Sequence, residues 1–413
     1  MNHKPHIAVV GAGFGGVYAA KRLARLLGDE ADITLIGRDN YFLFTPLLHE
    51  VATGGLSPRS VIEPVAEIFR GTSVHFCQGE VHGIDFGAKT VSSDNCSFVY
   101  DYLIMASGAK TNTYGVPGAA EHALKLKTLS DAVTLRKRVI ESIKKASRTT
   151  DDAERKRLLS FVVVGAGPTG VELVTELAEF VFQVAKSYYG KALSAHEISI
   201  TLIASGPEVI PQFSSKVRAK ALAVLRKKGV EVLLGTAVTK VLPDGVQTSR
   251  FVPAGTVVWV AGVEASFPEM KGETHMHKSG RLMVNEFLQI QGHTESFAVG
   301  DGAILPIKEG EPPVPQLAQT AVQEAQIAAA NIAALIRGQG VLTPFTYHSK
   351  GMLVSLGAWQ AAGDIFGMHP SGTLMWFLWR TVYLFKFNSW RKRLSIVSEW
   401  TINLFSPRDI SEI

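Results

Sequence analysis

Two glycine-rich stretches decide the fold: "IAVVGAGFGG" at Ile7–Gly16 and "FVVVGAGPTG" at Phe161–Gly170. Each begins with a short apolar run typical of a buried strand, continues with the spacing G-x-G-x-x-G, and leads into a segment with helical apolar spacing. One such match is weak, because a chain with 38 glycines produces it by chance. Two matches in the same context predict two βαβ nucleotide-binding units.

The glycines of each turn have separate physical roles. The first permits the tight turn, the second lets a pyrophosphate approach the backbone, and the third lets the helix pack closely on the strand. Amides at the helix N-terminus then face the phosphate charge. The residues concerned are Gly11, Gly13 and Gly16 in the first unit and Gly165, Gly167 and Gly170 in the second.

Composition limits the class of protein. Hydrophobic residues make up 46% of the 413-residue chain and charged residues 19%, which is typical of a compact protein with two or three domains. The net charge of +5 suits anionic cofactors or an anionic membrane surface. Because no long basic block is present, we expect no nucleic-acid partner.

The cysteines and histidines predict no special chemistry. Cys77 and Cys96 do not form a CxxC pair, so we expect two ordinary structural thiols in a reducing compartment. His275 and His277 lie in a polar loop, where solvent exposure is more common than metal binding, and we expect no metal. No run of about 20 apolar residues is present, so we expect no transmembrane helix.

Two dinucleotide sites in one chain indicate electron transfer between a tightly held flavin and an exchangeable nicotinamide. The N-terminal site is the better flavin candidate. A later strand, "ESFAVGDGAILP", ends in Gly300-Asp301, and this turn could return to the flavin site and hydrogen-bond its ribityl chain.

Six stretches occur in the order found in type II NADH:quinone oxidoreductases, which the chain resembles over nearly its whole length. They are "VVGAGFGG", "NYFLFTPLLHEVATGGLSP", "VVGAGPTGVELVTELAE", "TVVWVAGVEAS", "FAVGDGA" and "PQLAQTAVQEA". The resemblance implies a single-chain, peripheral membrane flavoenzyme. It also implies FAD in the first Rossmann domain, NADH in the second, inserted domain, and a quinone as electron acceptor.

The resemblance also implies roles for single residues. Glu172 matches the family's glutamate near the nicotinamide–flavin contact, and Gln319 and Gln323 belong to the quinone-side motif AQxAxQ. These two glutamines are four residues apart, so they share one helix face. On the quinone side we also place Pro46, Ala318 and Ala321, with "YFLFTPLL" at Tyr41–Leu48 as an apolar wall.

Further contacts with FAD are expected besides those of the glycine turn. They are Arg38, Ala109, Gly300 and Asp301.

The expected fold class is α/β, with two Rossmann-type dinucleotide-binding domains and a C-terminal amphipathic helical membrane-docking region. Residues 1–115 would form the first part of the FAD-binding domain, and residues 280–346 its second part with the quinone-side motif. Residues 116–279 would form the inserted NAD(P)H-binding domain with a helical lead-in, and residues 347–413 the membrane-docking region.

The chain departs from the family at the ends of two strands. Gly37 stands where an acid usually contacts the FAD ribose, and Arg38 and Asp39 are candidate substitutes. Losing one such bond of about 1 kcal/mol should not abolish FAD binding. Ala204 stands where an acid normally repels the 2′-phosphate of NADPH, and "IASGPEVIP" contains no Arg or Lys. We therefore predict that NADH is used and NADPH is less strongly rejected than usual.

The C-terminal 40 residues contain four of the six tryptophans. Two segments have amphipathic helical patterns: Leu374, Phe377, Leu378, Val382 and Phe385 share one stripe, and Trp390, Leu394, Val397, Thr401 and Leu404 another. "WRKRL" adds Arg391, Lys392 and Arg393. This combination predicts docking on an anionic bilayer surface. The alternative is a helical pair packed on the core or in a dimer interface.

The predicted function is transfer of two electrons from NADH through FAD to a membrane quinone, without ion pumping, at the cytoplasmic face of the inner or plasma membrane. Disulfide reductases and sulfide:quinone reductases are disfavoured because no cysteine pair accompanies the flavin segment. A flavin reductase using oxygen or another acceptor remains an alternative, as does a non-enzymatic membrane-associated nucleotide sensor. The identity of the quinone and the oligomeric state, with a homodimer as one option, stay open.

Overall fold

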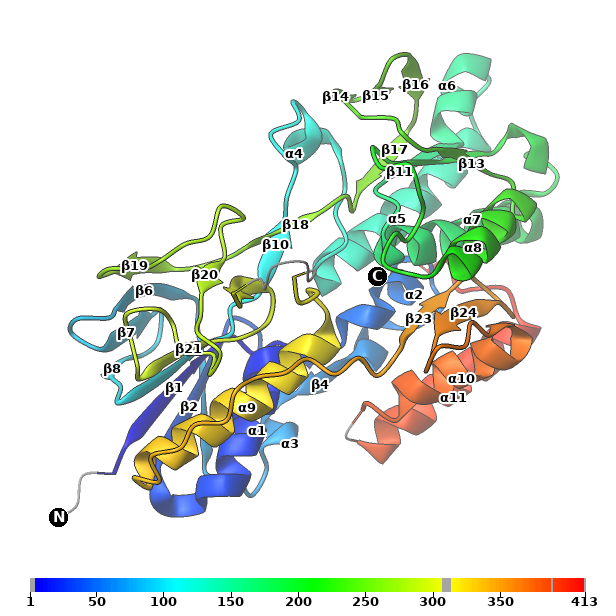
Figure 1. Ribbon diagram of the computed structural model, residues 1–413. Helices are drawn as coiled ribbons and strands as arrows, with labels where there is room; N and C mark the ends of the chain where they lie inside the picture. Colours follow the sequence, from blue (N-terminus) through cyan, green and yellow to red (C-terminus); the bar gives the residue numbers. More distant parts are fainter. Residues whose placement is uncertain (1–3, 307–312, 388, 412–413) are drawn as a thin grey trace. The chain divides into compact units, whose positions relative to one another are not determined.

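The computed structural model describes residues 4–306, 313–387 and 389–411, which group into two compact units (Figure 1). Each unit is assembled from three separate segments of the chain. Unit 1 comprises Met1–Leu43, Glu63–Lys110 and Val263–His348, and unit 2 comprises Phe44–Ile62, Thr111–Gly262 and Ser349–Ile413. Each unit therefore contains one of the two glycine turns.

Unit 1 is built on a five-stranded parallel sheet with the order β21-β9-β1-β2-β5. Its strands are β1 (His6–Val10), β2 (Asp32–Gly37), β5 (Val74–Gln78), β9 (Tyr102–Met105) and β21 (Ser296–Ala298). Ile7, Ala8 and Val9 of the central strand are fully buried. A strand covered on both faces has this continuous apolar sequence rather than an alternating one.

Two helices pack together in unit 1, α1 (Phe14–Leu27) and α9 (Ala318–Ile336) (Figure 1). Both bury small side chains, including Ala19 and Ala20 in α1 and Ala325 and Ala328 in α9. Small residues permit dense packing of two helix backbones. Helix α9 also packs against the short 3-10 turn η5 (Gly300–Gly302), and this contact places α9, which carries the predicted quinone-side motif, beside the Gly-Asp turn.

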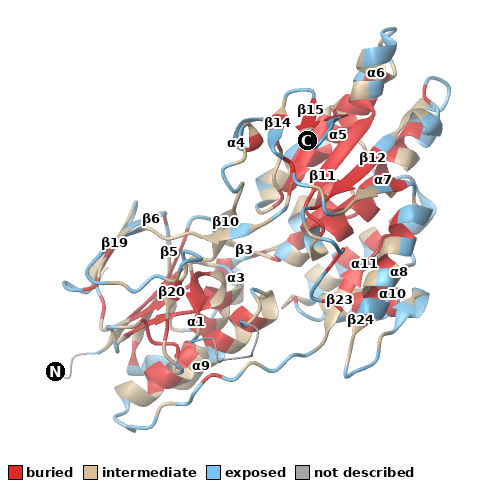
Figure 2. Ribbon diagram, turned by 45° about the horizontal axis from the view of Figure 1, so that its top comes forward, coloured by how far each residue is buried: buried red, intermediate tan, exposed pale blue. Residues whose placement is uncertain are grey.

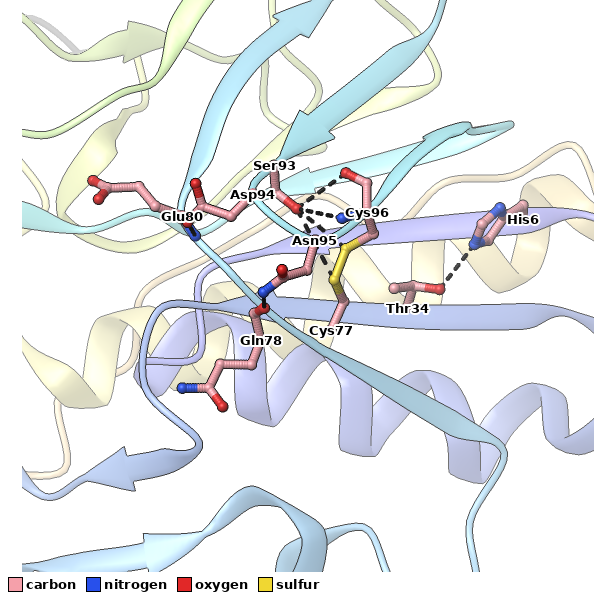
Figure 3. Close-up of a disulfide and its surroundings, with 9 residues drawn as sticks. All are labelled: His6, Thr34, Cys77, Gln78, Glu80, Ser93, Asp94, Asn95 and Cys96. Atoms are coloured by element: carbon pink, nitrogen blue, oxygen red, sulfur yellow. Dashed lines mark hydrogen bonds between the residues drawn. A yellow bond between two sulfur atoms is a disulfide. The ribbon is translucent and has the colours of Figure 1, made fainter.

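A second sheet of unit 1 joins β19 (Glu269–Lys271), β6 (Val81–Asp85), β7 (Thr90–Ser93) and β8 (Ser97–Val99). Cys77 of β5 and Cys96, in the turn between β7 and β8, form a disulfide with their Cα atoms 6.7 Å apart (Figure 3). The expectation of two thiols is therefore wrong, and the argument for a reducing compartment loses its support. The chain reverses direction through the antiparallel β6–β7 pair, so two cysteines 19 positions apart meet, and no CxxC spacing reveals this contact.

Unit 2 is built on a four-stranded parallel sheet with the order β13-β12-β11-β17. Its strands are β11 (Ser160–Val164), β12 (Ser199–Ile203), β13 (Val230–Leu233) and β17 (Thr256–Trp259), and its longer helices are α5 (Leu129–Ala146), α7 (Pro168–Tyr189) and α8 (Ser215–Lys227). All five residues of β11 are buried, as Figure 2 shows for this sheet. The α/β class with two Rossmann-type units is confirmed.

Shorter elements complete the two units. In unit 2 they are η2 (Thr45–Leu47), α2 (Leu48–Ala52), η3 (Pro58–Val61), α4 (Ala119–His122), α6 (Asp152–Leu158), η4 (Ala195–Glu197), β14 (Lys240–Leu242), β15 (Gly245–Gln247), β16 (Phe251–Pro253), β23 (Met352–Ser355), β24 (Ala361–Asp364) and β25 (Ser371–Gly372). Elsewhere they are η1 (Gly28–Glu30), β3 (Tyr41–Leu43), β4 (Ile62–Pro64), α3 (Val65–Ile68), β10 (Ala109–Thr111), β18 (Val263–Ala265), β20 (Leu282–Met283) and β22 (Ala303–Ile304).

The two C-terminal helices of unit 2, α10 (Thr373–Leu384) and α11 (Trp390–Phe405), confirm the predicted helical C-terminus. Their apolar stripes face outward: the exposed residues are Leu374, Phe377, Leu378, Val382, Phe385, Trp390, Leu394, Val397, Ile402, Leu404 and Phe405. Trp376, Trp379 and Trp400 are instead buried in the unit. Among the described residues, no helix combines the length and apolar character needed to cross a membrane.

Candidate functional site

In the glycine turn of unit 1, a side chain would clash with the protein backbone at two of the three glycines. At the third, Gly13, a side chain would enter open space. Gly11 has a φ of +106°, and a Cβ on it would lie 2.3 Å from the carbonyl oxygen of Ala106. A Cβ on Gly16 would lie 1.7 Å from the Gly11 oxygen, whereas one on Gly13 would meet nothing within 4 Å. Gly13 caps α1 without a side-chain hydrogen bond, so the first-turn amides fit a bound pyrophosphate.

The second glycine turn, in unit 2, repeats this arrangement. Gly165 has a φ of +116°, and a Cβ on Gly170 would lie 1.8 Å from the Gly165 oxygen. Gly167 again has nothing within 4 Å of its added Cβ. Helix α7 begins at Pro168 and has no side-chain cap. This turn therefore also fits a dinucleotide pyrophosphate.

The two strand ends that lack an acid differ in the space around them. Gly37 is the last residue of β2, and a Cβ there would lie 2.6 Å from the Cβ of Ala12. Arg38, a predicted FAD contact, is a mostly exposed side chain 4.0 Å from Glu80. Ala204 follows β12, and its amide donates to the carbonyl oxygen of Leu233 at 2.9 Å. Ala109, the other predicted contact, begins β10 and is half-buried.

The Gly300-Asp301 turn is held by side chains from α9 and from the segment before it. Gly300, with a φ of +75°, donates its N–H to Glu324 Oε2 at 2.5 Å. Gln316 Nε2 donates to the Asp301 carbonyl oxygen at 3.0 Å. Burial raises the pKa of Glu324 to about 8, and Asp301 adds to this, while the Gly300 amide and Arg281 oppose it. Glu324 is therefore a neutral acid at pH 7.

Sequence reasoning missed Glu324, because the family motif ends one residue earlier. A signal was nevertheless present. Glu324 falls in the buried stripe of α9 with Ala321, Ala325 and Ala328, and an acid within an apolar stripe calls for a specific partner.

Helix α9 carries the quinone-side motif residues Ala318, Gln319, Ala321 and Gln323. Gln323 Nε2 donates to the carbonyl oxygens of His348 and Gln319, at 3.0 and 3.3 Å, and its Oε1 accepts from the His348 N–H at 3.1 Å. Gln323 thus fixes the chain at His348 as well as sharing the face of Gln319. Ala318 and Gln319 are half-buried.

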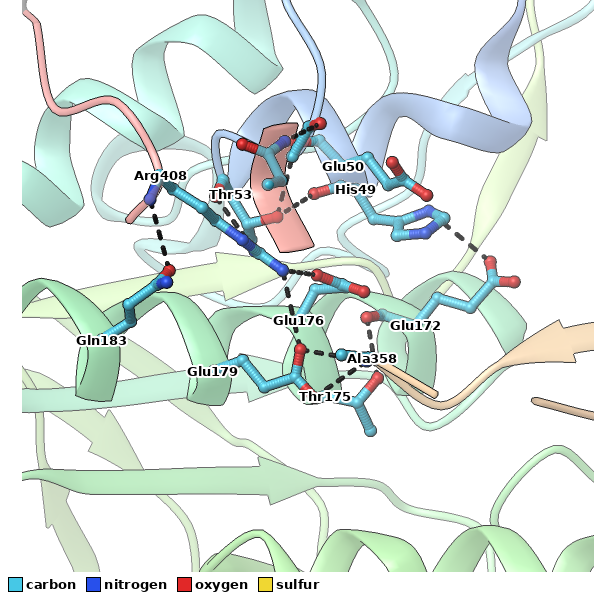
Figure 4. A network of polar contacts seen from close by, with 12 residues as sticks. His49, Glu50, Thr53, Glu172, Thr175, Glu176, Glu179, Gln183, Ala358 and Arg408 are labelled. Carbon is cyan, nitrogen blue, oxygen red and sulfur yellow. Dashed lines mark hydrogen bonds and ion pairs between the residues drawn. The ribbon is translucent and has the colours of Figure 1, made fainter. Parts of the chain in front are cut away.

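Three carboxylates form a row along one face of α7: Glu172 and Glu176, which are buried, and Glu179, which is half-buried (Figure 4). Arg408 from the C-terminal segment lies over this row, contacting Glu176 Oε2 and, at 3.6 Å, Glu179 Oε2. Burial alone would raise the pKa of Glu176, but Arg408 outweighs it and the pKa is lowered. Glu176 and Arg408 therefore form a buried, charged pair, which sequence reasoning did not predict.

Glu172 lies at the end of this row and is neutral. Its Oε1 accepts from the Ser355 N–H at 3.0 Å, and its Oε2 lies 3.8 Å from His49 Nδ1. Burial raises the pKa of Glu172 to about 8 and lowers that of His49 to about 4. The short distance resembles an ion pair, yet at pH 7 both groups are uncharged, with the proton on Glu172.

Glu50 extends the polar network toward α11. Its Oε2 accepts from Trp400 Nε1 at 2.6 Å, and burial raises its pKa to about 7, against the opposing effect of Arg380. The adjacent His49 ring lies 6.0 Å from that of Trp379. Helices α2, α7, α10 and α11 are therefore joined by buried polar and aromatic contacts within unit 2.

The expected apolar wall at Tyr41–Leu48 is partly covered. Phe44 is 2% exposed and packs against Tyr383 and Phe387, with ring centroids 5.7 and 4.7 Å apart. Leu47 and Leu48 are also buried. Pro46 is half-buried in η2.

The inward face of α11 combines the buried side chains of Ile396 and Trp400 with several polar contacts. Glu399 accepts from the Ser57 N–H at 2.6 Å and from Ser60 Oγ at 2.5 Å. Lys392 Nζ donates to the Arg59 carbonyl oxygen at 2.5 Å, and Asn403 Nδ2 to that of Gly55 at 2.7 Å. The helix is thus held by hydrogen bonds on one side and presents its apolar residues on the other.

The two histidines of the polar loop have local partners. His277 Nδ1 lies 2.8 Å from Ser279 Oγ, and His275 Nε2 lies 3.8 Å from Glu273. Within the part of the chain that the structure describes, no three His, Cys, Asp or Glu side chains gather into a metal-binding group.

Two parallel sheets, each with a glycine turn open at its second glycine, define the class of two-dinucleotide pyridine-nucleotide oxidoreductases. Residues 5–325 match the family described as pyridine nucleotide-disulphide oxidoreductase, and residues 349–409 match the NDH2 C-terminal domain. The chain is 33% identical to a type II NADH:quinone oxidoreductase of Mycobacterium tuberculosis, covering 97% of this chain and 88% of that protein.

Two further comparisons agree. A type II NADH:quinone oxidoreductase of Staphylococcus aureus is 31% identical, covering 89% of this chain and 91% of its own length. The solved structure of NDH2 from Plasmodium falciparum in complex with NADH has the same fold, with a TM-score of 0.90, 23% identity and coverage of 99% of this chain and all of that one. The chain belongs to the type II NADH:quinone oxidoreductases.

Proposed function

We propose that this protein oxidises NADH and reduces a membrane quinone, with FAD as its prosthetic group. The observation that carries the proposal is the repeated turn: Gly13 and Gly167 each leave open space beside an uncapped helix N-terminus, in two separate parallel sheets. A second dinucleotide turn has no use in an enzyme that binds only one such cofactor.

FAD binding is assigned to unit 1. Gly11, Gly13 and Gly16 hold the pyrophosphate, and Asp301 holds the ribityl chain; Arg38, Ala109 and Gly300 complete the contacts. When bound, FAD would supply the chemistry of hydride acceptance and of two-electron transfer to the quinone. The protein's part is to orient both partners and to set the polarity around them.

NADH binding is assigned to unit 2, where Gly165, Gly167 and Gly170 accept the pyrophosphate. Glu172 is the candidate residue near the nicotinamide. Ala204 supplies no charge to repel a 2′-phosphate, so we propose that NADPH is accepted beside NADH, with the lower efficiency expected when no arginine attracts that phosphate.

NADH, one proton and a quinone give NAD⁺ and a quinol, so one proton is needed besides the hydride that NADH supplies. Glu172 is a buried acid that keeps its proton at pH 7, and neutral His49 lies 3.8 Å away. We assign Glu172 the role of holding a proton for this reaction. Gln319, Gln323, Pro46, Ala318 and Ala321 are assigned to the quinone side.

Peripheral docking on the cytoplasmic face of the membrane is assigned to α10 and α11. Their exposed apolar residues suit the interfacial region of a bilayer. Of the three basic residues predicted to assist, Lys392 and Arg393 donate to the carbonyl oxygens of Arg59 and Phe387, and Arg391 is exposed.

The visible spectrum of the purified protein tests the redox function. We expect a yellow protein that NADH bleaches and a soluble quinone re-oxidises. Re-oxidation by oxygen alone at an equal rate would favour the flavin reductase alternative. A colourless protein that FAD cannot reconstitute would overturn the proposal, and nucleotide binding without bleaching would favour the sensor.

Membrane docking needs a test that spares the fold. Truncation at Gly372 would remove Trp376, Trp379 and Trp400, which are 2%, 0% and 6% exposed, so it would damage unit 2 itself. A triple substitution to Ser at Leu374, Leu394 and Phe405, which are 84%, 56% and 84% exposed, removes apolar surface only.

We expect the triple variant to move to the soluble fraction on cell fractionation with an unchanged flavin spectrum. Val341→Ser is the matched control, because Val341 is 81% exposed in unit 1 and outside the docking face. A triple variant that stays membrane-bound would reject the docking face.

A further inference from the structure

Glu324 is a buried acid of unit 1 with no role in the chemistry assigned above. It is 3% exposed, and its Oε2 accepts the Gly300 N–H at 2.5 Å. The contact links α9 to η5, the turn assigned to the flavin ribityl chain. An acid in such a position satisfies a backbone donor that would otherwise lack a partner.

A second side chain hydrogen-bonds the same turn at a different backbone atom. Gln316, at the start of the segment leading into α9, donates its Nε2 to the Asp301 carbonyl oxygen at 3.0 Å. The turn is therefore held at the N–H of Gly300 and at the C=O of Asp301. Both contacts come from one nine-residue stretch, Gln316–Glu324.

The turn has a conformation that needs such support. Gly300 has a φ of +75°, and a Cβ on it would lie 3.3 Å from the Cβ of Ala321. Its backbone therefore lies close to α9, and its N–H points to the helix. Arg281, Thr320 and Glu324 are among the residues that line a small cavity beside the turn.

We propose that Glu324 and Gln316 are positioning residues that hold the Gly300-Asp301 turn in its flavin-binding conformation. The proposal rests on the assignment of FAD to unit 1. The stretch that carries Gln319 and Gln323 would then have a second role, because it also positions the backbone of the FAD site.

The charge state of Glu324 provides a matched variant. Because burial raises its pKa to about 8, the side chain is neutral at pH 7, and Gln replaces it without a change of charge. The amide oxygen of Gln can still accept the Gly300 N–H. Glu324→Gln should therefore keep FAD affinity, whereas Glu324→Ala removes the acceptor.

The test measures the dissociation constant of FAD by titrating the apoprotein of the full chain and following flavin fluorescence at pH 7. Loss of one buried hydrogen bond should weaken FAD binding about tenfold in Glu324→Ala. Gln316→Ala should weaken FAD binding by about threefold to tenfold, because water competes for the hydrogen bond of this exposed amide. Glu324→Gln should stay within about twofold of wild type.

Asn331→Ala is the control on the same helix. Asn331 is 1% exposed and hydrogen-bonds the backbone of Phe287 and Thr343, away from η5. This variant should lower the melting temperature and leave the FAD dissociation constant unchanged. An equal loss of FAD affinity in Asn331→Ala and Glu324→Ala would reduce Glu324 to a general stabilising residue and overturn the proposal.

Two outcomes separate failure of this inference from failure of the proposed function. If wild-type apoprotein does not bind FAD, the assignment of FAD to unit 1 is wrong. If it binds FAD and both Gln316→Ala and Glu324→Ala retain wild-type affinity, the positioning role is wrong. Gln316 is exposed, so its variant keeps the test decisive if Glu324→Ala does not fold.

Discussion

The two nucleotide-binding units have nearly the same glycine turn but differ where the second strand ends. A Cβ on the third glycine would lie 1.7 Å from the Gly11 oxygen in unit 1 and 1.8 Å from the Gly165 oxygen in unit 2. At the strand ends, a Cβ on Gly37 would lie 2.6 Å from that of Ala12, whereas Ala204 already carries one.

Both strand ends lack the acid, but the space around positions 37 and 204 differs. In unit 1 the methyl group of Ala12 occupies the space that a side chain at position 37 would need. In unit 2 the strand end already accommodates the Cβ of Ala204, and the carboxylate that would extend from it is missing. Restoring an acid should therefore change nucleotide choice in unit 2 and damage cofactor binding in unit 1.

The largest effects are expected from the third glycines. Gly16→Ala should yield a colourless protein, because the new methyl group overlaps the Gly11 carbonyl and opens the FAD turn. Gly170→Ala should remain yellow but lose bleaching by NADH. Absorbance spectra with and without NADH measure both results.

Gly13→Ala separates ligand contact from folding in this comparison. The added methyl group meets nothing within 4 Å in the protein, so the melting temperature of the apoprotein should not change. FAD binding should nevertheless weaken, since the methyl group enters the space of the pyrophosphate.

For the third glycine, the contradicting result is a Gly16→Ala variant that is stable and still yellow. It would refute the assignment of this turn to FAD.

Nucleotide selectivity tests the strand end of unit 2. We expect the wild-type preference for NADH over NADPH in kcat/KM to stay below about a thousandfold. Ala204→Glu should raise this preference by at least about tenfold, because a carboxylate repels the 2′-phosphate. Ala204→Gln has the same length without the charge and should change the ratio much less.

The strand end of unit 1 should respond in the opposite sense. Gly37→Glu should weaken FAD binding, because overpacking against Ala12 costs about 1–3 kcal/mol. Combining it with Ala12→Gly should recover most of the affinity. FAD titration of the two single variants and the double variant measures the coupling, and additive losses would contradict the steric explanation.

Buried acids with a raised pKa occur in both units, and the pKa is raised to about 8 for Glu172 in unit 2 and for Glu324 in unit 1. A raised folded-state pKa gives stability that is present below the unfolded pKa and is lost as pH rises through the folded pKa. In wild type, Glu172 should lower the free energy of unfolding between about pH 5 and pH 8, with a slope below the one-proton limit of about 1.4 kcal/mol per pH unit. Glu172→Gln should remove this slope. Urea unfolding at several pH values measures it.

The identical pH response of Glu172→Gln and wild type would show that Glu172 is ionised in the folded protein. The same experiment on Glu324→Gln compares the two units directly. Glu176→Gln is a contrasting control, because Arg408 lowers the pKa of Glu176 and the sign of its pH dependence is reversed.

Local patterns predicted the core of both units well. The run Ile7–Val10 corresponds to β1 at His6–Val10, and Ile33–Ile36 to β2 at Asp32–Gly37. These elements follow from apolar runs and glycine spacing over fewer than 40 residues, which local backbone geometry enforces. The outward apolar stripes of α10 and α11 were predictable for the same reason.

Partners distant in the chain were not predictable. The Cys77–Cys96 disulfide, the Glu324–Gly300 hydrogen bond and the Arg408–Glu176 pair each join segments that no local pattern connects. The inward face of α11 is another case. The sequence predicts that Glu399 faces solvent, but the tertiary structure brings Ser57 and Ser60 within hydrogen-bond distance of it.

The sequence by itself determined two strand–turn–helix units, their glycines, and an amphipathic C-terminus, because each depends on the periodicity and steric size of neighbouring residues. Only the tertiary structure decided which acids are neutral, which are paired, and whether a strand end has room for a side chain. Those properties depend on desolvation and on contacts across hundreds of residues, as between Arg408 and Glu176.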